Sequence, residues 1–272
     1  MLKSMRRASR LGMLVALVGA AAVIATAADA SLAAVRAPQS LLLVDSPTQI
    51  PSGPVPDQQS PAQPTQPGLQ TVVLDPAHGG TDEGAHGAGG ILEKDVVLTL
   101  AQVVRARLRN DGWKVVMTRT GDQTLSFEQR AAIANAQPNA VFISLDVGSS
   151  GPVGSTYVYY YDFGQIIENQ PETTARGLVD WDRAQLDWEP LSKRLAQLLQ
   201  VELAARLRGS PELPTGAPVY QLREVAEPAI AIEIGNVNAA SATELDAFGK
   251  PLAAAISGAL QAFRMVYQTK AP

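Results

Sequence analysis

The sequence contains no cysteine and only two histidines, His78 and His86, among its 272 residues. The lack of cysteine excludes disulfides, thiolate metal sites and cysteine nucleophiles. Any histidine chemistry must come from one short segment. Charged residues make up 18% and the net charge is −4, so the chain lacks the clustered Lys and Arg with which proteins neutralise phosphates. We therefore expect no nucleic-acid partner.

The N-terminal thirty residues follow the order of an export signal. Basic residues up to Arg10 precede an apolar run over 11–28, which ends in the small-residue sequence Ala28-Asp29-Ala30. Eighteen apolar residues are also just long enough to cross a bilayer, so an uncleaved membrane anchor is the alternative. The Ala- and Gly-rich run favours a cleaved signal peptide over residues 1–30. We expect the mature protein in the periplasm or at the outer face of the cell envelope.

Residues 31–69 predict an extended tether. Eight of the nineteen prolines fall in this region, separated mainly by polar residues, and such a composition cannot bury enough apolar surface to fold. The folded domain is expected over residues 70–268. With 46% hydrophobic residues in the chain, this remainder is long enough for one domain with its own core.

Apolar runs and helical periodicities alternate through the domain. Val97, Leu100, Val104 and Leu108 recur at helical spacing, and Gly112 follows where a helix-ending glycine belongs. The same reasoning predicts strands over 70–74, 115–118, 140–144, 155–161 and 229–234, and helices over 93–111, 126–136, 190–208 and 241–267. Ser126 and Gln129 have capping-box spacing. Alternating strands and helices indicate an α/β fold of three α/β/α layers with a mostly parallel central sheet.

Polar residues gather where the predicted strands end. They are Asp75, His78, Glu93, Asp146 and Glu233. In parallel sheets, ligands bind beyond the carboxyl ends of the strands. A carboxylate inside an apolar strand such as the one around Glu233 is costly unless it is paired. Each residue alone could be a helix cap or a solvated strand end, but together they predict one metal or acid/base site.

The glycine-rich segment from His78 to Gly90 has two rival interpretations that fail. It follows a strand, as a phosphate-binding loop would, but it lacks the Lys-Ser/Thr ending of a P-loop and the spacing of a dinucleotide fingerprint. A serine hydrolase is excluded because the sequence has no Gly-x-Ser-x-Gly elbow.

A succession of motifs resembles the zinc-dependent N-acetylmuramoyl-L-alanine amidases of the amidase-3 type. The motifs are Asp75-Pro-Ala-His78-Gly-Gly, Leu92-Glu93-Lys-Asp95, Val116-Met-Thr-Arg119, Glu128-Gln-Arg130, Phe142-Ile-Ser144 and Pro228-Ala-Ile-Ala-Ile-Glu233-Ile-Gly235, with Asn238 after them. The resemblance covers nearly all of residues 70–267. It implies a peptidoglycan hydrolase that cuts the amide between the lactyl group of N-acetylmuramic acid and L-alanine, with peptidoglycan or muropeptides as substrate.

The resemblance also implies roles for individual residues. His78 and Glu93 match zinc ligands, and Glu233 matches the catalytic glutamate. The third zinc ligand in the family is a histidine, where this chain has Asp146, and the family's asparagine two residues later is Gly148. The expected site is one Zn²⁺ ion held by His78, Glu93 and Asp146, with His86 as an alternative ligand.

Residues 162–190 are the expected contact for a partner. In relatives this region can hold a helix that covers the site until an activator moves it. Trp181 and Trp188, among several aspartates, would suit a glycan or peptide surface. The alternative is that both tryptophans pack on the core. A second possible function is a catalytically degenerate domain that binds or regulates the cell wall.

Overall fold

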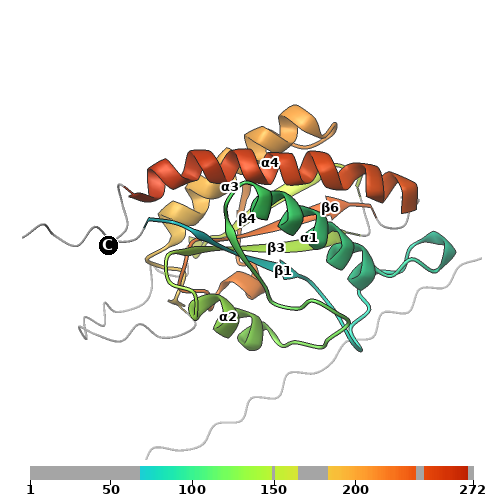
Figure 1. Ribbon diagram of the computed structural model, residues 1–272, viewed down its shortest axis with the longest axis horizontal. Coiled ribbons are helices and arrows are strands. Elements are labelled where there is room, and N and C mark those ends of the chain that lie inside the picture. The colour runs from blue at the N-terminus through green and yellow to red at the C-terminus, as the bar shows by residue number, and fades with distance from the viewer. Residues whose placement is uncertain (1–67, 149–150, 165–182, 237–241, 269–272) are drawn as a thin grey trace, which may run out of the picture. The chain divides into compact units, whose positions relative to one another are not determined.

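The computed structural model describes residues 68–148, 151–164, 183–236 and 242–268 (Figure 1). The predicted signal peptide over 1–30 lies outside these residues, as does almost all of the predicted tether over 31–69. The first strand begins at Thr71, close to the expected start of the domain at residue 70. No helix among the described residues is long and apolar enough to cross a membrane.

Six strands form one sheet in the order β2-β1-β3-β6-β4-β5. Their bounds are β1 Thr71–Pro76, β2 Lys114–Met117, β3 Ala140–Gly148, β4 Thr156–Tyr161, β5 Thr215–Ala217 and β6 Ala229–Gly235. Strands β2, β1, β3 and β6 are parallel, whereas β4 pairs antiparallel with β6 and parallel with β5. The mostly parallel sheet is therefore confirmed. The sequence analysis missed β5, because three residues are too few to show a periodicity.

Helices cover both faces of the sheet, as predicted, but unequally. Figure 1 shows α1 (Glu93–Asn110), α3 (Glu189–Arg206) and α4 (Ala242–Gln268) on one side, with α2 (Phe127–Asn135) on the other. The larger core packs apolar residues of α1, α3 and α4 against the sheet. On the opposite face, a smaller core packs α2 and the 3-10 helix η4 (Tyr220–Leu222) against it. A further 3-10 turn, η1 (Ala88–Gly90), precedes α1.

Side chains of β3 alternate between these two cores, because successive residues of a strand point to opposite faces. Val141, Ile143, Leu145 and Val147 belong to the larger core, whereas Phe142 belongs to the smaller one. The alternation places Asp146 on the α2 face. Its register partner on β6 is Glu233, which shares that face. Both carboxylates therefore lie on the side that only short helices cover.

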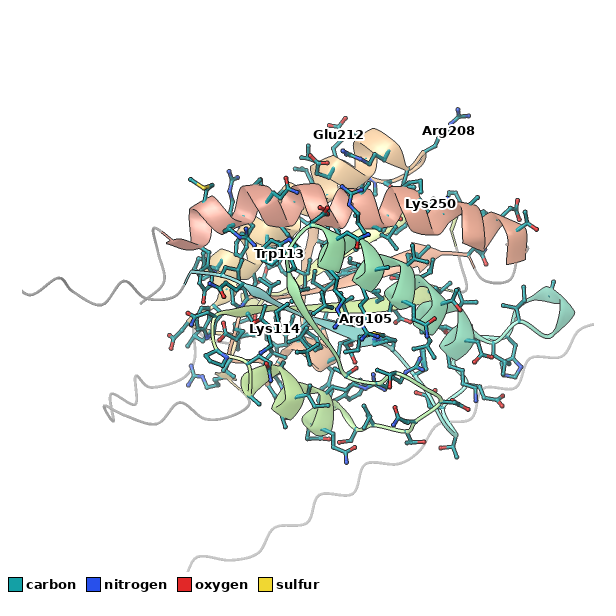
Figure 2. All side chains as sticks on the ribbon, in the orientation of Figure 1. Arg105, Trp113, Lys114, Arg208, Glu212 and Lys250 are labelled. Atoms are coloured by element: carbon teal, nitrogen blue, oxygen red, sulfur yellow. The ribbon has the colours of Figure 1, made fainter. Side chains whose placement is uncertain are left out.

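Local signals account for the helix ends. The Ser126 side chain accepts a hydrogen bond from the Gln129 backbone amide, and the Gln129 side chain accepts one from the Ser126 backbone amide, which confirms the predicted capping box. Gly112 follows α1 with a φ of 86°, a conformation that costs glycine least. The next residue, Trp113 (Figure 2), is buried. The Arg264 guanidinium of α4 lies 3.9 Å from the ring centroid of Trp113. This contact fastens the end of α1 to the last helix.

Candidate metal centre

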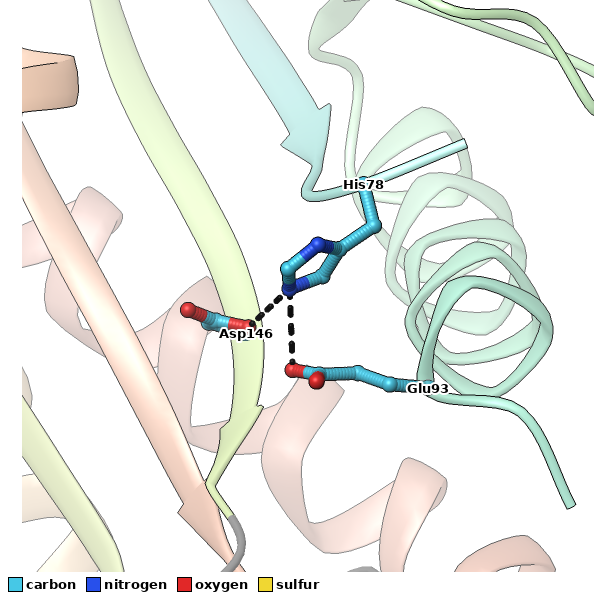
Figure 3. A group of neighbouring side chains, drawn as sticks. All are labelled: His78, Glu93 and Asp146. Atoms are coloured by element: carbon cyan, nitrogen blue, oxygen red, sulfur yellow. Dashed lines mark ion pairs between the residues drawn. The ribbon is translucent and has the colours of Figure 1, made fainter. Parts of the chain in front are cut away.

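Three side chains from distant parts of the sequence converge near the carboxyl ends of β1 and β3. His78 lies in the loop after β1, Glu93 is the first residue of α1, and Asp146 lies in β3 (Figure 3). His78 Nε2 is 3.3 Å from Glu93 Oε1 and 3.4 Å from Asp146 Oδ1. One ligand atom from each residue lies within 4.8 Å of the other two. The structure therefore brings together all three predicted metal ligands.

The backbone of the β1–α1 loop is bent to present His78. The φ angle of His78 is 58°, which is uncommon for a residue other than glycine. Two buried arginines hold this strained backbone. Arg130 donates to the carbonyls of Pro76 and His78, at 2.8 Å and 2.7 Å, and Arg119 donates to those of Pro76 and Ala77, at 2.9 Å and 2.8 Å. Four hydrogen bonds from these two arginines thus hold the backbone that presents the imidazole.

Backbone amides fix the carboxylate of Glu93. Its Oε2 accepts from the Ala85 amide at 2.6 Å and its Oε1 from the Val147 amide at 2.9 Å. Burial works to raise the pKa of Glu93, but the hydrogen bonds from His78, Asp146 and these amides outweigh it and lower that pKa to about 2. Glu93 is therefore an anion with a fixed direction, as a metal ligand must be.

Gly84 makes room for that carboxylate. A Cβ atom there would lie 2.6 Å from Glu93 Oε2, and the φ of Gly84 is 67°. Both the space and the left-handed backbone require glycine at this position.

The cluster has the charge to hold a cation. The carboxylates of Asp146 and Glu93 raise the pKa of His78 to about 11 against the opposing effect of burial. Burial raises the pKa of Asp146, with a further contribution from Glu93. A proton on the imidazole offsets one of the two carboxylate charges, so the three side chains keep a net negative charge that a cation can neutralise. One imidazole nitrogen and two carboxylate oxygens are donors that a divalent cation such as zinc accepts, so the residues fit a metal ion.

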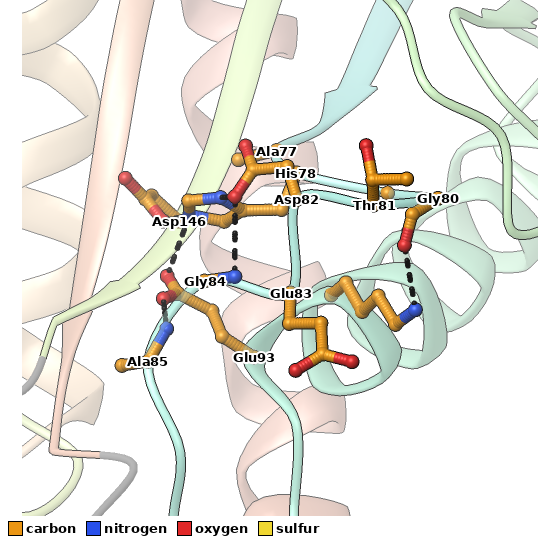
Figure 4. A network of polar contacts seen from close by, with 12 residues as sticks. Ala77, His78, Gly80, Thr81, Asp82, Glu83, Gly84, Ala85, Glu93 and Asp146 are labelled. Atoms are coloured by element: carbon orange, nitrogen blue, oxygen red, sulfur yellow. Dashed lines mark hydrogen bonds and ion pairs between the residues drawn. The ribbon is translucent and has the colours of Figure 1, made fainter.

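Asp82 supports His78 from the other side of the ring. Its Oδ1 lies 2.9 Å from His78 Nδ1, the nitrogen that points away from Glu93 and Asp146 (Figure 4). Carboxylates in this position commonly orient metal-binding histidines. Asp82 was not among the predicted site residues, although an acidic residue four positions after the histidine was a usable signal.

The loop that carries Asp82 is clamped to the loop after β2. The Lys94 ammonium lies 2.9 Å from the Gly80 carbonyl and 3.0 Å from Asp122 Oδ2, and the Gly80 amide donates to Asp122 Oδ1 at 2.6 Å. Figure 4 shows Gly80 in the same loop as His78 and Asp82. A Cβ atom at Gly80 would lie 2.0 Å from Thr124 Oγ1, so the two loops pack too closely for any other residue.

Asp75 and His86 do not join the cluster. Asp75 is buried and accepts hydrogen bonds from Thr118, Arg130 and Ser144, at 2.6, 2.6 and 3.0 Å. It belongs to the scaffold under the site. The side chain of His86 is 63% exposed, and its Nε2 lies 2.9 Å from Glu83. His86, the alternative metal ligand, therefore contacts Glu83 and lies outside the cluster.

Glu233 lies beside the cluster but outside the group of three. It is the register partner of Asp146 across β3 and β6. The three residues that share a possible metal position are His78, Glu93 and Asp146 alone among the residues described. This placement suits a carboxylate that moves protons next to a metal.

The segment 162–190 is described only in part. Trp181 lies outside the described residues. Trp188 directly precedes α3 and packs against the larger core. For Trp188, the alternative interpretation of core packing is therefore correct.

Comparisons with known proteins identify the family of the chain. The N-acetylmuramoyl-L-alanine amidase family matches residues 72–262. AmiA of Escherichia coli (strain K12) is 45% identical over 78 residues, which are 29% of this chain and 27% of AmiA. CwlM of Bacillus licheniformis, also an N-acetylmuramoyl-L-alanine amidase, is 31% identical over 187 residues, 67% of this chain and 64% of CwlM. The matched region thus spans about a quarter of AmiA and under two thirds of CwlM.

Two solved structures share the fold. The amidase AmiC2 of Nostoc punctiforme has a TM-score of 0.53 and 29% identity, and the alignment covers 71% of this chain and 98% of AmiC2. CwlD of Clostridioides difficile, solved in complex with the GerS lipoprotein, has a TM-score of 0.56 at 21% identity, with 72% and 99% of the two chains covered. Since the family match extends over well more than half of the sequence, this chain belongs to the N-acetylmuramoyl-L-alanine amidase family of the amidase-3 type.

Proposed function

We propose that this protein is a zinc-dependent N-acetylmuramoyl-L-alanine amidase that acts on peptidoglycan or muropeptides. The bond cleaved is the amide between the lactyl group of N-acetylmuramic acid and L-alanine of the stem peptide. The observation that carries the proposal is the convergence of His78, Glu93 and Asp146 on one position, beside Glu233, in a domain of this family.

Each residue then has a chemical task. His78, Glu93 and Asp146 hold the ion, and a bound zinc supplies a Lewis acid that polarises the scissile carbonyl and makes a water more acidic. Glu233 takes a proton from the attacking water and returns it to the departing amine of L-alanine. The hydroxyl of the water forms the new bond to the carbonyl carbon as the carbon–nitrogen bond breaks.

Because Asp146 stands in place of a histidine, we expect a different dependence of the rate on pH. Two carboxylates and one imidazole leave less positive charge at the metal position than one carboxylate and two imidazoles would. We therefore expect slower turnover near neutral pH and an optimum at higher pH than a site with two histidines would show.

The test is zinc content and muropeptide release for wild type, Asp146→Ala, Asp146→His and Glu233→Gln. We expect Asp146→Ala to lose zinc, Asp146→His to bind it and gain activity, and Glu233→Gln to keep zinc and lose turnover. Asp95→Ala, which removes an exposed carboxylate of α1, is the control and should change neither quantity. Zinc binding by wild type no better than by Asp146→Ala would overturn the proposal.

One observation favours a second candidate function, a catalytically degenerate domain that binds or regulates the cell wall. A protonated His78, 3.3 Å from Glu93 and 3.4 Å from Asp146, forms ion pairs that occupy the site and offset one carboxylate charge without a metal. In that case purified wild type would be metal-free and inactive, yet would sediment with peptidoglycan.

Location and partners follow from the proposed substrate. We infer export to the periplasm or the outer face of the envelope, supported by the basic–apolar–small order of residues 1–30. We also infer an activating partner that acts on residues 162–190. The structure of CwlD with the GerS lipoprotein supports the idea that a protein of this fold can have a protein partner.

A further inference from the structure

The side chain of Glu233 lies between neighbours on two adjacent strands. On β3, Asp146 and Gly148 are the register partners of Glu233 and Gly235. On β4, Tyr157 is the register partner of Glu233, and Tyr159 that of Ala231. These residues share the α2 face of the sheet, because they are either directly opposite one another or two residues apart along a strand.

Gly148 provides the space in which the Glu233 carboxylate lies. A Cβ atom at Gly148 would be 2.4 Å from Glu233 Oε1 and 3.2 Å from its Cδ. The backbone does not require glycine here, because the φ of Gly148 lies outside the left-handed region. The Glu233 carboxylate therefore explains why this position is a glycine, because neither a turn nor backbone strain requires one there.

Tyr159 lies near the same carboxylate on the other strand, because its register partner Ala231 is two residues before Glu233. Burial, the negative charge of Glu233 and a hydrogen bond to Glu233 raise the pKa of Tyr159 to about 12. The phenol is thus placed to donate a hydrogen bond to the Glu233 carboxylate.

We propose that Gly148 and Tyr159 are positioning residues that set where the Glu233 carboxylate stands: Gly148 leaves its space open, and Tyr159 holds it there by a hydrogen bond. The proposal rests on the proposed role of Glu233 as the group that moves protons. It assigns a function to Gly148, which stands where the resemblance places an asparagine in the family.

Displacement of Glu233 should cost little stability and much activity. A Cβ atom at Gly148 meets only the far end of a flexible side chain, which can swing aside. A general base, however, must lie within about 2.6–3.2 Å of the proton it takes, and a misplacement of about 1 Å can cost about 100-fold in rate. A large loss of kcat with no loss of stability therefore distinguishes a positioning residue from a structural one.

The experiment compares Gly148→Ala and Tyr159→Phe with two controls in the full-length, zinc-loaded protein. Gly121→Ala adds a methyl group where no atom lies within 4 Å, and Tyr160→Phe removes a hydroxyl from the neighbouring residue of β4, which packs in the core on the other face. We expect kcat for muropeptide cleavage to fall about 10- to 100-fold in the two test variants. KM, zinc content and melting temperature should stay at wild-type values, and both controls should match wild type.

Two further measurements make the result specific. In a Glu233→Gln background, Gly148→Ala should cause no additional loss, because the group that it displaces no longer moves protons. A crystal structure of Gly148→Ala should show the Glu233 carboxylate displaced from its wild-type position.

Failure of this inference and failure of the proposed role of Glu233 have different outcomes. If Glu233→Gln is inactive while Gly148→Ala and Tyr159→Phe have the wild-type kcat, the positioning role is wrong and the role of Glu233 stands. If Glu233→Gln or a zinc-free wild type is as active as zinc-loaded wild type, or if wild type has no turnover, both are wrong.

Discussion

Arg130 Nη1 lies 2.6 Å from Asp75 Oδ1, and both side chains are almost fully buried. The two residues come from α2 and β1, 55 positions apart in the sequence. The same guanidinium donates to the carbonyls of Pro76 and His78. An ion pair inside the scaffold therefore fixes the backbone that presents His78.

Replacement of Arg130 should lower the free energy of unfolding of the domain. Arg130→Met leaves Asp75 as a buried charge without its partner, a change that typically costs about 3–5 kcal/mol in the free energy of unfolding. Urea denaturation of the domain measures the loss. The control is Arg107→Met, which removes the exposed pair with Asp111, whose atoms are 2.7 Å apart; it should cost about 1 kcal/mol or less. Equal losses for the two variants would contradict the scaffold role of Arg130.

Asp82 should strengthen metal binding without contacting the metal. Asp82→Asn keeps the shape of the side chain but removes the charge 2.9 Å from His78 Nδ1. Loss of such an orienting carboxylate typically weakens metal affinity by about 10- to 100-fold, which a competition titration with a chromophoric chelator measures. Asp95→Asn is the matched control and should bind zinc as wild type does. Unchanged affinity in Asp82→Asn would show that the contact is incidental.

Zinc affinity should rise with pH beyond the range in which an ordinary histidine titrates. The pKa of His78 is raised from 6.5 to about 11 by Asp146 and Glu93, and zinc binds only the neutral imidazole. Below a pH of about 11, each unit of acidification should therefore weaken binding about tenfold.

Titrations at about pH 6.5 and about pH 8.5 measure this slope, and calorimetry in buffers of different ionisation enthalpy counts the released proton. His86→Gln removes the exposed histidine and should leave the slope unchanged. Affinity that levels off above about pH 7 would show that the imidazole is not protonated in the metal-free site.

Glu227 should make the fold less stable at alkaline pH. It is 7% exposed, and burial raises its pKa from 4.5 to about 7. A raised pKa in the folded state stabilises the protein fully below about pH 4.5, and this contribution is lost as the pH rises through about 7.

Glu227→Gln has no carboxyl group to ionise, so the variant should not lose stability in this way as the pH rises. We expect the variant to melt a few degrees above wild type at about pH 8.5, since about 1 kcal/mol moves the midpoint by about 2–4 °C in a domain of this size. At about pH 4.5 the gain should disappear. Glu212→Gln, at an exposed position near the end of α3 (Figure 2), should behave as wild type at both values. A gain for Glu227→Gln that is the same at both pH values would show that Glu227 is not protonated in the fold.

Local sequence signals determined most of the secondary structure. Five of the six strands and the four α-helices follow from apolar runs, helical periodicity, a capping box and a terminal glycine. These signals are strong because each depends on residues a few positions apart. The convergence of His78, Glu93 and Asp146 was also predictable, since the carboxyl ends of parallel strands meet at one edge. The signal peptide, the tether and the domain limits at 70 and 268 stay predictions.

Only the tertiary structure decided what each polar residue contacts. The sequence placed Asp75 beside His78, but only the fold turned it toward Arg130 and Ser144 and so into the scaffold. It also showed that Gly148 leaves space for Glu233. Such contacts join residues 55 to 85 positions apart, and they depend on strand register and side-chain direction. No local pattern encodes either, because packing of the whole domain sets both.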